Sequence, residues 1–200
     1  VGALAAYVSA PSQTHRAALL DLVAYVGCTA ERGITYGRSD EPLQIFCDAN
    51  FASCRDTRRS ITGYAVVMYG GAVSWASKKQ PTTAVSTMEA EYQACGAVAR
   101  ECLSLMKGLN ELAFVCDDFP IDGPLTIHCD NQAALTLCKD RKEGQRAKHI
   151  DVTHHFAREH VEFGTIQFVY IRSADNVSDC FTKALSRPVL ETCLRGLGMM

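Results

Sequence analysis

Apolar residues recur along this chain first at helical spacing and then in short runs that suit β-strands. Residues 12–27 carry an apolar series with the period of a helix, and Ser12 or Thr14 can cap its start. Three strands are then expected, at residues 43–48, 61–71 and 72–78. The Gly70-Gly71 pair predicts a hairpin between the second and the third, so the early strands are expected to form a meander.

The second half of the chain predicts strands that alternate with helices. A long helical pattern covers about residues 86–115. Two further strands are expected at residues 125–130 and 165–171, and further helices at residues 131–138, 146–164, 175–185 and 187–197. A meander followed by alternating strands and helices indicates an α/β protein with a mixed sheet covered by helices.

Four acidic residues lie where these elements begin or end. Asp48 and Asp130 close apolar runs, whereas Glu91 lies near the start of the long helix and Asp179 follows the last strand. Strand ends and helix starts can converge on one point of an α/β sheet, where such carboxylates repel one another unless a multivalent cation neutralises them. Carboxylate oxygens suit Mg²⁺ or Mn²⁺, and a pair of such ions commonly breaks phosphodiesters. The pattern therefore predicts a metal-dependent nuclease.

Helical geometry separates Glu91 from its neighbour Glu89. Helical residues advance by about 100° each, so the two side chains point to nearly opposite sides. The face of Glu91 continues through Cys95, Val98, Cys102, Leu105, Leu109 and Leu112. The face of Glu89 continues through Gln93, Arg100, Ser104, Lys107 and Glu111. Glu91 is therefore expected to point to the interior, where an unpaired charge is costly, and Glu89 to act as a first-turn acid favoured by the helix dipole.

The other three acids each have a simpler interpretation. Asp48 can be a turn residue, and Asp130 serves equally well as a helix N-cap or as a metal ligand. Asp175 precedes the helix expected at 175–185 and resembles its cap, which leaves Asp179 as the better ligand. The case for a metal site therefore depends on all four acids together.

Composition narrows the class of protein. The 200 residues, 48% of them hydrophobic, can bury a core, and no apolar stretch approaches the roughly 20 residues that span a membrane. The ten cysteines include no C-x-x-C pair, so they are expected to be reduced core thiols of an intracellular protein rather than zinc ligands or disulfides. The histidines around residues 149–160 lack an H-E-x-x-H motif and are expected on the surface.

The net charge of −2 is unusual for a free-standing nucleic-acid-binding protein, but basic residues are clustered. One group lies around residue 58, another around residue 78, and a third within 139–149. Interleaved with the acids, they suit contacts to a phosphate backbone. The candidate nucleic-acid-binding residues are Arg58, Arg59, Lys78, Lys79, Asn131, Gln132, Lys148 and His149.

Several motifs together resemble one known family. They are DTRRSITGY, SWASKKQP, STMEAEYQA, CDNQAAL, KHIDVTHHF and DNVSDCFTKAL, in this order. In order and spacing they resemble the ribonuclease H domain of copia-type LTR retrotransposon polyproteins, over about residues 43–186. The resemblance implies a ribonuclease H domain at 41–186, a segment joining it to reverse transcriptase at 1–40, and a C-terminal helix or tail at 187–200.

The resemblance also implies a fold and an activity. The expected fold is α/β, a ribonuclease H-like mixed five-stranded sheet with its first three strands antiparallel, flanked by helices. The implied activity is hydrolysis of the RNA strand of RNA–DNA hybrids, with two Mg²⁺ ions (or Mn²⁺ as a substitute) on the four acids that match the family's catalytic positions: Asp48, Glu91, Asp130 and Asp179. One departure is Asn50-Phe51, where the family usually has Asp-Trp.

The implied partners are an RNA–DNA hybrid and the upstream reverse transcriptase domain of the same polyprotein, with no membrane. The expected location is intracellular: the cytoplasm, a virus-like particle or the nucleus. One alternative is a catalytically degraded domain of the same fold that only binds hybrid or braces a polymerase. An integrase-type nuclease is disfavoured, because it needs two Asp followed by a Glu, whereas the order here is Asp, Glu, Asp, Asp.

Overall fold

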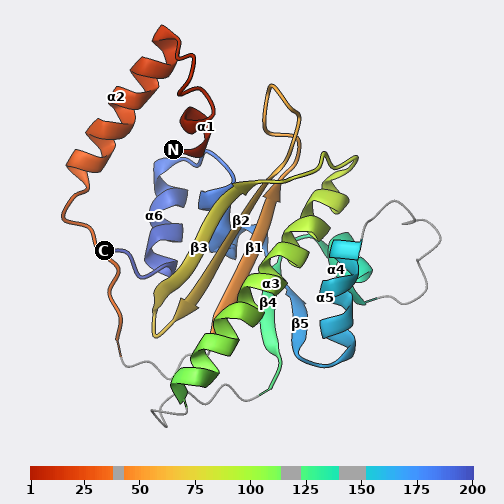
Figure 1. Cartoon of the computed structure of the whole chain (residues 1–200). Helices are drawn as coiled ribbons and strands as arrows, with labels where there is room; N and C mark the ends of the chain where they lie inside the picture. The colour runs from red at the N-terminus through yellow and green to blue at the C-terminus, as the bar shows by residue number, and fades with distance from the viewer. Residues whose placement is uncertain (38–42, 114–122, 140–151) are drawn as a thin grey trace.

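A five-stranded sheet forms the centre of the computed structural model, which describes residues 1–37, 43–113, 123–139 and 152–200 (Figure 1). The strands are β1 (Gln44–Asn50), β2 (Ile61–Met68), β3 (Gly71–Lys79), β4 (Leu125–Cys129) and β5 (Ile166–Tyr170). Their order is β3-β2-β1-β4-β5, with β1, β2 and β3 antiparallel and β4 and β5 parallel to β1. The expected mixed sheet with three leading antiparallel strands is confirmed.

The turn between β2 and β3 confirms the predicted hairpin. Tyr69 and Gly70 both have positive φ, 53° and 74°. Two successive positive φ angles match the right-handed twist of the strands that such a turn joins, and glycine adopts this conformation without steric cost. The hairpin places β3 at one edge of the sheet and β1 at its centre.

Helices pack on both faces of the sheet, and β1 contributes to both cores because its alternate residues point to opposite sides. Ile45 and Cys47 belong to the larger core, beneath α3 (Thr87–Ala113), α4 (Gln132–Lys139) and α5 (Val152–Glu162). Phe46 belongs to a smaller core on the other face, beneath η3 (Val177–Phe181) and α6 (Arg187–Gly196), which lies behind the strands in Figure 1. The central strand is therefore buried from Ile45 to Ala49.

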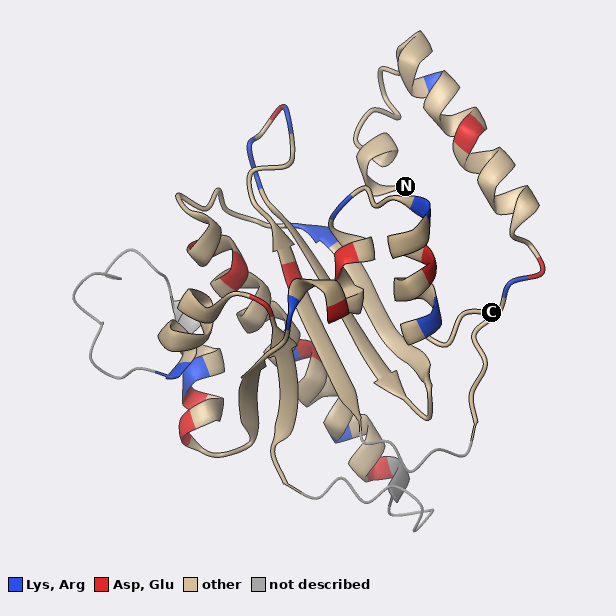
Figure 2. Cartoon of the chain, turned by 180° about the vertical axis from the view of Figure 1, so that it is seen from behind, with Lys and Arg blue, Asp and Glu red and all other residues tan. Residues whose placement is uncertain are grey.

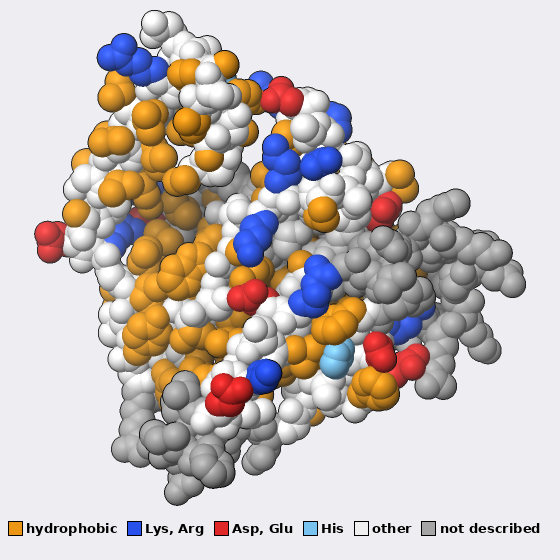
Figure 3. Space-filling view, viewed as in Figure 1, with side chains coloured by type: hydrophobic (Ala, Val, Ile, Leu, Met, Phe, Trp, Pro, Cys, Tyr) orange, Lys and Arg blue, Asp and Glu red, His pale blue; other side chains and the backbone are white. Residues whose placement is uncertain are grey.

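The N-terminal helices stand away from the sheet (Figure 1). They are α1 (Gly2–Ala5) and α2 (Gln13–Cys28). Ser12 caps α2 as predicted, since its hydroxyl accepts a hydrogen bond from the His15 backbone N–H at 3.3 Å. The apolar series of α2 does not pack on the sheet: Leu19, Leu20, Tyr25 and the valines between and after them are exposed. Figure 3 shows hydrophobic side chains gathered on α2 and on the neighbouring face of the sheet.

The segment 175–185, expected to be an α-helix, instead forms short 3₁₀ turns, η2 (Ser173–Asp175) and η3. The helix expected at 187–197 is confirmed as α6, and α5 ends before Gly164, whose φ is 70°. The part of the helix expected before residue 152 lies outside the described residues. Among the described residues, no helix has both the length and the apolar character needed to span a membrane.

Candidate active site

Asp48 lies inside β1, opposite Gly63 of β2, and its side chain is fully buried. The strand continues to Asn50, so the interpretation of Asp48 as a turn residue is wrong. The hydroxyl of Thr182 and the Nζ of Lys183 donate hydrogen bonds to its carboxylate, the latter at 3.1 Å. Gly63 allows this approach, because a Cβ there would come within 2.5 Å of the Thr182 side chain.

The faces of α3 separate Glu91 from Glu89 as expected. Glu91 is 7% exposed, and its Oε2 is buried with no hydrogen-bond partner among the described residues. Glu89 accepts a hydrogen bond from the backbone N–H of Val85 at 2.8 Å, while Ser86 Oγ accepts one from the Glu89 N–H at 3.2 Å. This exchange satisfies free donors at the start of the helix. Glu89 therefore stabilises the helix start, and Glu91 points inward.

The face of α3 that carries Glu89 lies opposite the buried face and is expected in solvent, but one of its residues is buried. Gln93 is 8% exposed rather than solvated, because the segment before α3 covers the first turns of the helix. The hydroxyl of Thr82 donates to the side-chain oxygen of Gln93 at 3.2 Å. The helical period assigns Gln93 to the side opposite the sheet, but it does not show that a loop returns over that side.

The structure also shows which residues near Asp130 and Asp179 cap helices and which remain as candidate metal ligands. Asn131, not Asp130, caps α4, since its Oδ1 accepts a hydrogen bond from the Ala134 N–H at 3.0 Å. Asn176 caps η3, so the prediction that Asp175 is the cap is wrong. Asp175 instead pairs with Arg172 at 2.7 Å. Other residues therefore provide the caps, and Asp130 and Asp179 both remain candidate metal ligands.

The four acids converge from β1, α3, the end of β4, and η3. One carboxylate oxygen from each of Asp48, Asp130 and Asp179 lies within 4.8 Å of the other two. An oxygen of Glu91, an oxygen of Asp130 and the sulfur of Cys129 form a second group with the same spacing. Asp130 therefore joins the two groups, and Figure 2 shows acidic segments of separate elements gathered on the sheet.

Burial and the neighbouring negative charges make two of these carboxylates, Glu91 and Asp179, costly to ionise. Burial, followed by the charges of Cys129, Asp48 and Asp130, raises the pKa of Glu91 to about 10. Burial likewise raises the pKa of Asp179. Hard oxygen donors, mutual repulsion and the unpartnered Oε2 of Glu91 fit the needs of a divalent cation such as Mg²⁺ or Mn²⁺. These four residues are the ones that would hold it.

Lys183 is a functional candidate that the sequence analysis missed. Its Nζ lies 3.1 Å from Asp48 Oδ1 and 2.9 Å from Asp179 Oδ1, so one ammonium bridges two of the acids. Burial alone would lower the pKa of Lys183, but these two carboxylates raise it overall. The i,i+4 spacing from Asp179 was the available signal, although the contact with Asp48 depends on the fold.

Replacing Lys183 with Met is expected to tighten Mg²⁺ binding by about tenfold, because it removes a cation that competes for Asp48 and Asp179. The metal-free protein should also become less stable, since two neighbouring carboxylates lose their counter-ion. Calorimetric titration with Mg²⁺ and thermal unfolding without it measure these two effects. Lys78→Met, on the exposed end of β3, is the control, and equal Mg²⁺ affinity in both variants would refute competition.

The candidate nucleic-acid-binding residues divide into three groups. Arg58 and Arg59 lie exposed on the loop after β1, and Ile61 pairs with Lys79, so this loop adjoins the basic end of β3. Figure 2 shows basic residues on this loop, beyond the acids of the sheet. Asn131 is engaged as a helix cap, and its neighbour Gln132 is exposed. Lys148 and His149 lie outside the described residues.

Comparison with known proteins gives relatives along the whole chain, although no family model matches it. The chain is 34% identical over 199 residues to the retrovirus-related Pol polyprotein from transposon TNT 1-94 of Nicotiana tabacum. It is 31% identical over 201 residues to the corresponding polyprotein from transposon RE2 of Arabidopsis thaliana. These alignments cover 100% of this chain but 14% of each polyprotein.

Among solved structures, a ribonuclease H1 from the halophilic archaeon Halobacterium salinarum aligns with 70% of this chain. The alignment covers 93% of that protein, with 16% sequence identity and a TM-score of 0.47.

Proposed function

Because the chain belongs to the retrovirus-related Pol polyproteins of transposons, we propose that it is their ribonuclease H, cutting the RNA strand of RNA–DNA hybrids. The observation that carries the proposal is the convergence of Asp48, Glu91, Asp130 and Asp179 from four separate elements. The resemblance to copia-type motifs, noted in the sequence, implies that the same four acids match that family's catalytic positions.

The four acids would share the work of holding divalent cations. Asp48, Asp130 and Asp179 would be ligands on one side of the cluster, and Glu91 with Asp130 on the other. Lys183, which now pairs with Asp48 and Asp179, would yield its place to the metal. When bound, two Mg²⁺ ions activate a water for in-line attack on phosphorus and stabilise the departing 3′ oxygen. Thr182 orients the carboxylate of Asp48 through its hydroxyl.

Recognition of the hybrid would use the basic residues beside the cluster. Arg58, Arg59, Lys78 and Lys79 would contact backbone phosphates, a contribution that does not depend on base sequence. The 2′-hydroxyls exposed in the minor groove would distinguish the RNA strand from DNA. Hybrids of this kind arise during reverse transcription, so the proposed setting is an intracellular particle that contains the polyprotein.

The exposed apolar residues of α2 suit a place beside the upstream reverse transcriptase domain. Leu19, Val23 and Val26 are 49–60% exposed on a helix that stands off the sheet. Hydrophobic residues gathered in this way indicate an interaction surface. In the polyprotein relatives the aligned region is 14% of the whole length, so those proteins contain much further chain that would be able to cover such a surface. We therefore assign the α2 face to the polymerase part of the same polyprotein.

A non-catalytic hybrid-binding domain is the second candidate, and Lys183 is the observation that favours it. A lysine that already neutralises Asp48 and Asp179 lets the cluster persist without metal. In that case the domain would bind a hybrid or brace a polymerase, and hydrolysis would be absent.

Metal dependence of cleavage separates the two candidates. We expect the chain to cut the labelled RNA strand of an RNA–DNA hybrid in Mg²⁺, leaving 5′-phosphate ends, and to leave duplex DNA of the same sequence intact. A chelator should stop the reaction, and Mn²⁺ should restore it. Hybrid binding without cleavage in either metal would establish the binding domain instead.

A further inference from the structure

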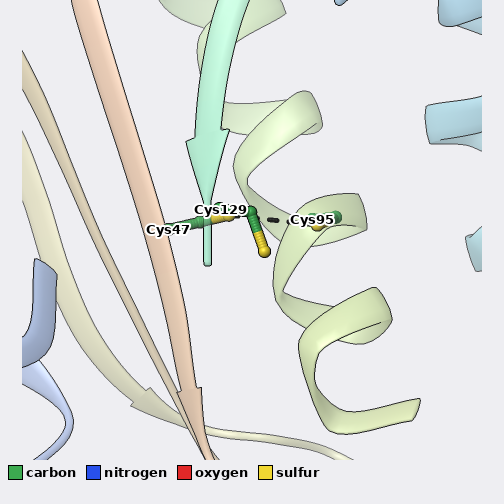
Figure 4. Close-up of side chains that lie close together, drawn as sticks. All are labelled: Cys47, Cys95 and Cys129. Carbon is green, nitrogen blue, oxygen red and sulfur yellow. Dashed lines mark hydrogen bonds between the residues drawn. The ribbon is translucent and has the colours of Figure 1, made fainter. Parts of the chain in front are cut away.

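Three cysteines meet directly beside the acidic cluster. Cys47 of β1, Cys95 of α3 and Cys129 of β4 are each 0% exposed. Their sulfur atoms all lie within 4.8 Å of one another, and the sulfurs of Cys47 and Cys95 are 3.9 Å apart. Figure 4 shows the three side chains converging between the two strands and the helix. All three are also members of the larger hydrophobic core.

The spacing matches thiolate metal coordination rather than a disulfide. In a tetrahedral site with metal–sulfur bonds of about 2.3 Å, neighbouring sulfurs lie roughly 3.8 Å apart. A disulfide needs about 2.05 Å. The 3.9 Å between the sulfurs of Cys47 and Cys95, which share a thiol hydrogen bond in the absence of metal, is therefore close to the first value and far from the second.

A candidate fourth donor lies beside Cys129. A carboxylate oxygen of Glu91 lies within 4.8 Å of the Cys129 sulfur, in the group that also contains Asp130. Glu91 is more than nine-tenths buried, and its Oε2 has no hydrogen-bond partner among the described residues. Asp130, on the other side of this group, is only half-buried, so the group of Glu91, Cys129 and Asp130 approaches the surface at Asp130.

We propose that Cys47, Cys95 and Cys129, with Glu91 as a fourth ligand, form a binding site for a thiophilic divalent cation such as Zn²⁺ or Cd²⁺. Soft thiolates select such ions, whereas the carboxylates alone suit Mg²⁺. Binding displaces the thiol protons to solvent, and no electron transfer is involved.

The two sites share Glu91 and are linked through the backbone. Cys47 directly precedes Asp48, Cys129 directly precedes Asp130, and Cys95 follows Glu91 by one helical turn. A thiophilic ion that recruits Glu91 would take this ligand from the oxygen site and shift its neighbours. Such an ion would therefore inhibit Mg²⁺-dependent hydrolysis. This inhibition rests on the proposed function, whereas binding of the ion does not.

The test is a Cd²⁺ titration of the reduced chain, followed by the ultraviolet absorption of cadmium–thiolate bonds. Cys28 and Cys54, which lie at or near the surface, are first replaced with Ser to remove competing thiols. In this background we compare Cys95→Ser with Cys102→Ser. Both cysteines are buried on α3, but only Cys95 belongs to the cluster.

We expect the background and Cys102→Ser to bind one equivalent of Cd²⁺ with the same absorption. Cys95→Ser should bind at least about tenfold more weakly and lose part of the band. Equal titrations of the two variants, or no band in the background, would overturn the proposal. If circular dichroism shows Cys95→Ser to be unfolded, Cys129→Ser decides the same comparison. A chain that binds Cd²⁺ but never cuts a hybrid retains the thiol site while the proposed function fails.

Discussion

Replacing Asp48 with Asn is expected to lower cleavage of an RNA–DNA hybrid by at least about a thousandfold while the chain stays folded. Asp48 is one of three acids whose carboxylate oxygens lie within 4.8 Å of one another, and of these three it is the most buried, so its position in the cluster is fixed by β1. Asn has nearly the same shape and keeps an acceptor for the Thr182 hydroxyl, but it removes the charge that would bind metal. The cleavage rate in Mg²⁺ and thermal unfolding measure the two sides of this prediction.

Asp175→Asn is the matched control for this variant. Asp175 lies a few residues from Asp179 in sequence, yet it is exposed and pairs with Arg172 rather than with the cluster. It should retain near-normal cleavage, and Asp130→Asn should behave like Asp48→Asn. Retention of a tenth or more of the activity in folded Asp48→Asn would exclude two-metal hydrolysis at this cluster.

The strands and the interior acid could be predicted because their signals are local. Alternating or continuous apolar runs locate β1 to β5, and Gly70 locates the hairpin. The 100° advance of a helix distinguishes Glu91 from Glu89 without knowledge of the partner elements. Each of these features depends on residues close together in the sequence, where spacing determines geometry.

The remaining features depend on contacts between distant segments. The helix expected at 175–185 becomes η3 because Asn176 is drawn into the core, where its Nδ2 donates to the carbonyl oxygen of Cys47 at 2.9 Å. The bridge between Lys183 and Asp48 crosses 135 residues of sequence. The cysteine cluster likewise combines residues from three elements. Each cysteine alone is predicted to be a core residue, and only the fold shows that the three lie together.

Replacing Glu91 with Gln is expected to lower activity and raise the stability of the metal-free protein at the same time. Cleavage in Mg²⁺ should fall at least about a hundredfold, because a buried metal ligand is lost. Stability should change in the opposite direction, because the folded chain raises the pKa of Glu91 from its ordinary 4.5 to about 10. Unfolding releases the proton at neutral pH, so this residue costs stability increasingly as pH rises from about 4.5 toward 10.

Gln removes this titration, so metal-free Glu91→Gln should exceed the wild type at pH 8 by on the order of 2 kcal/mol in denaturant unfolding. The difference should shrink toward pH 5.

Glu89→Gln is the control on the same helix: it should keep most of the activity and lose a few tenths of a kcal/mol of stability, roughly the value of a first-turn charge. Loss of activity in Glu89→Gln with full activity in Glu91→Gln would reverse the assignment of the two faces of α3. Equal pH dependence of stability in the wild type and Glu91→Gln would mean that folding does not raise the pKa of Glu91, because other groups already compensate its buried charge. The unpartnered oxygen of Glu91 would then no longer indicate that the site needs a metal.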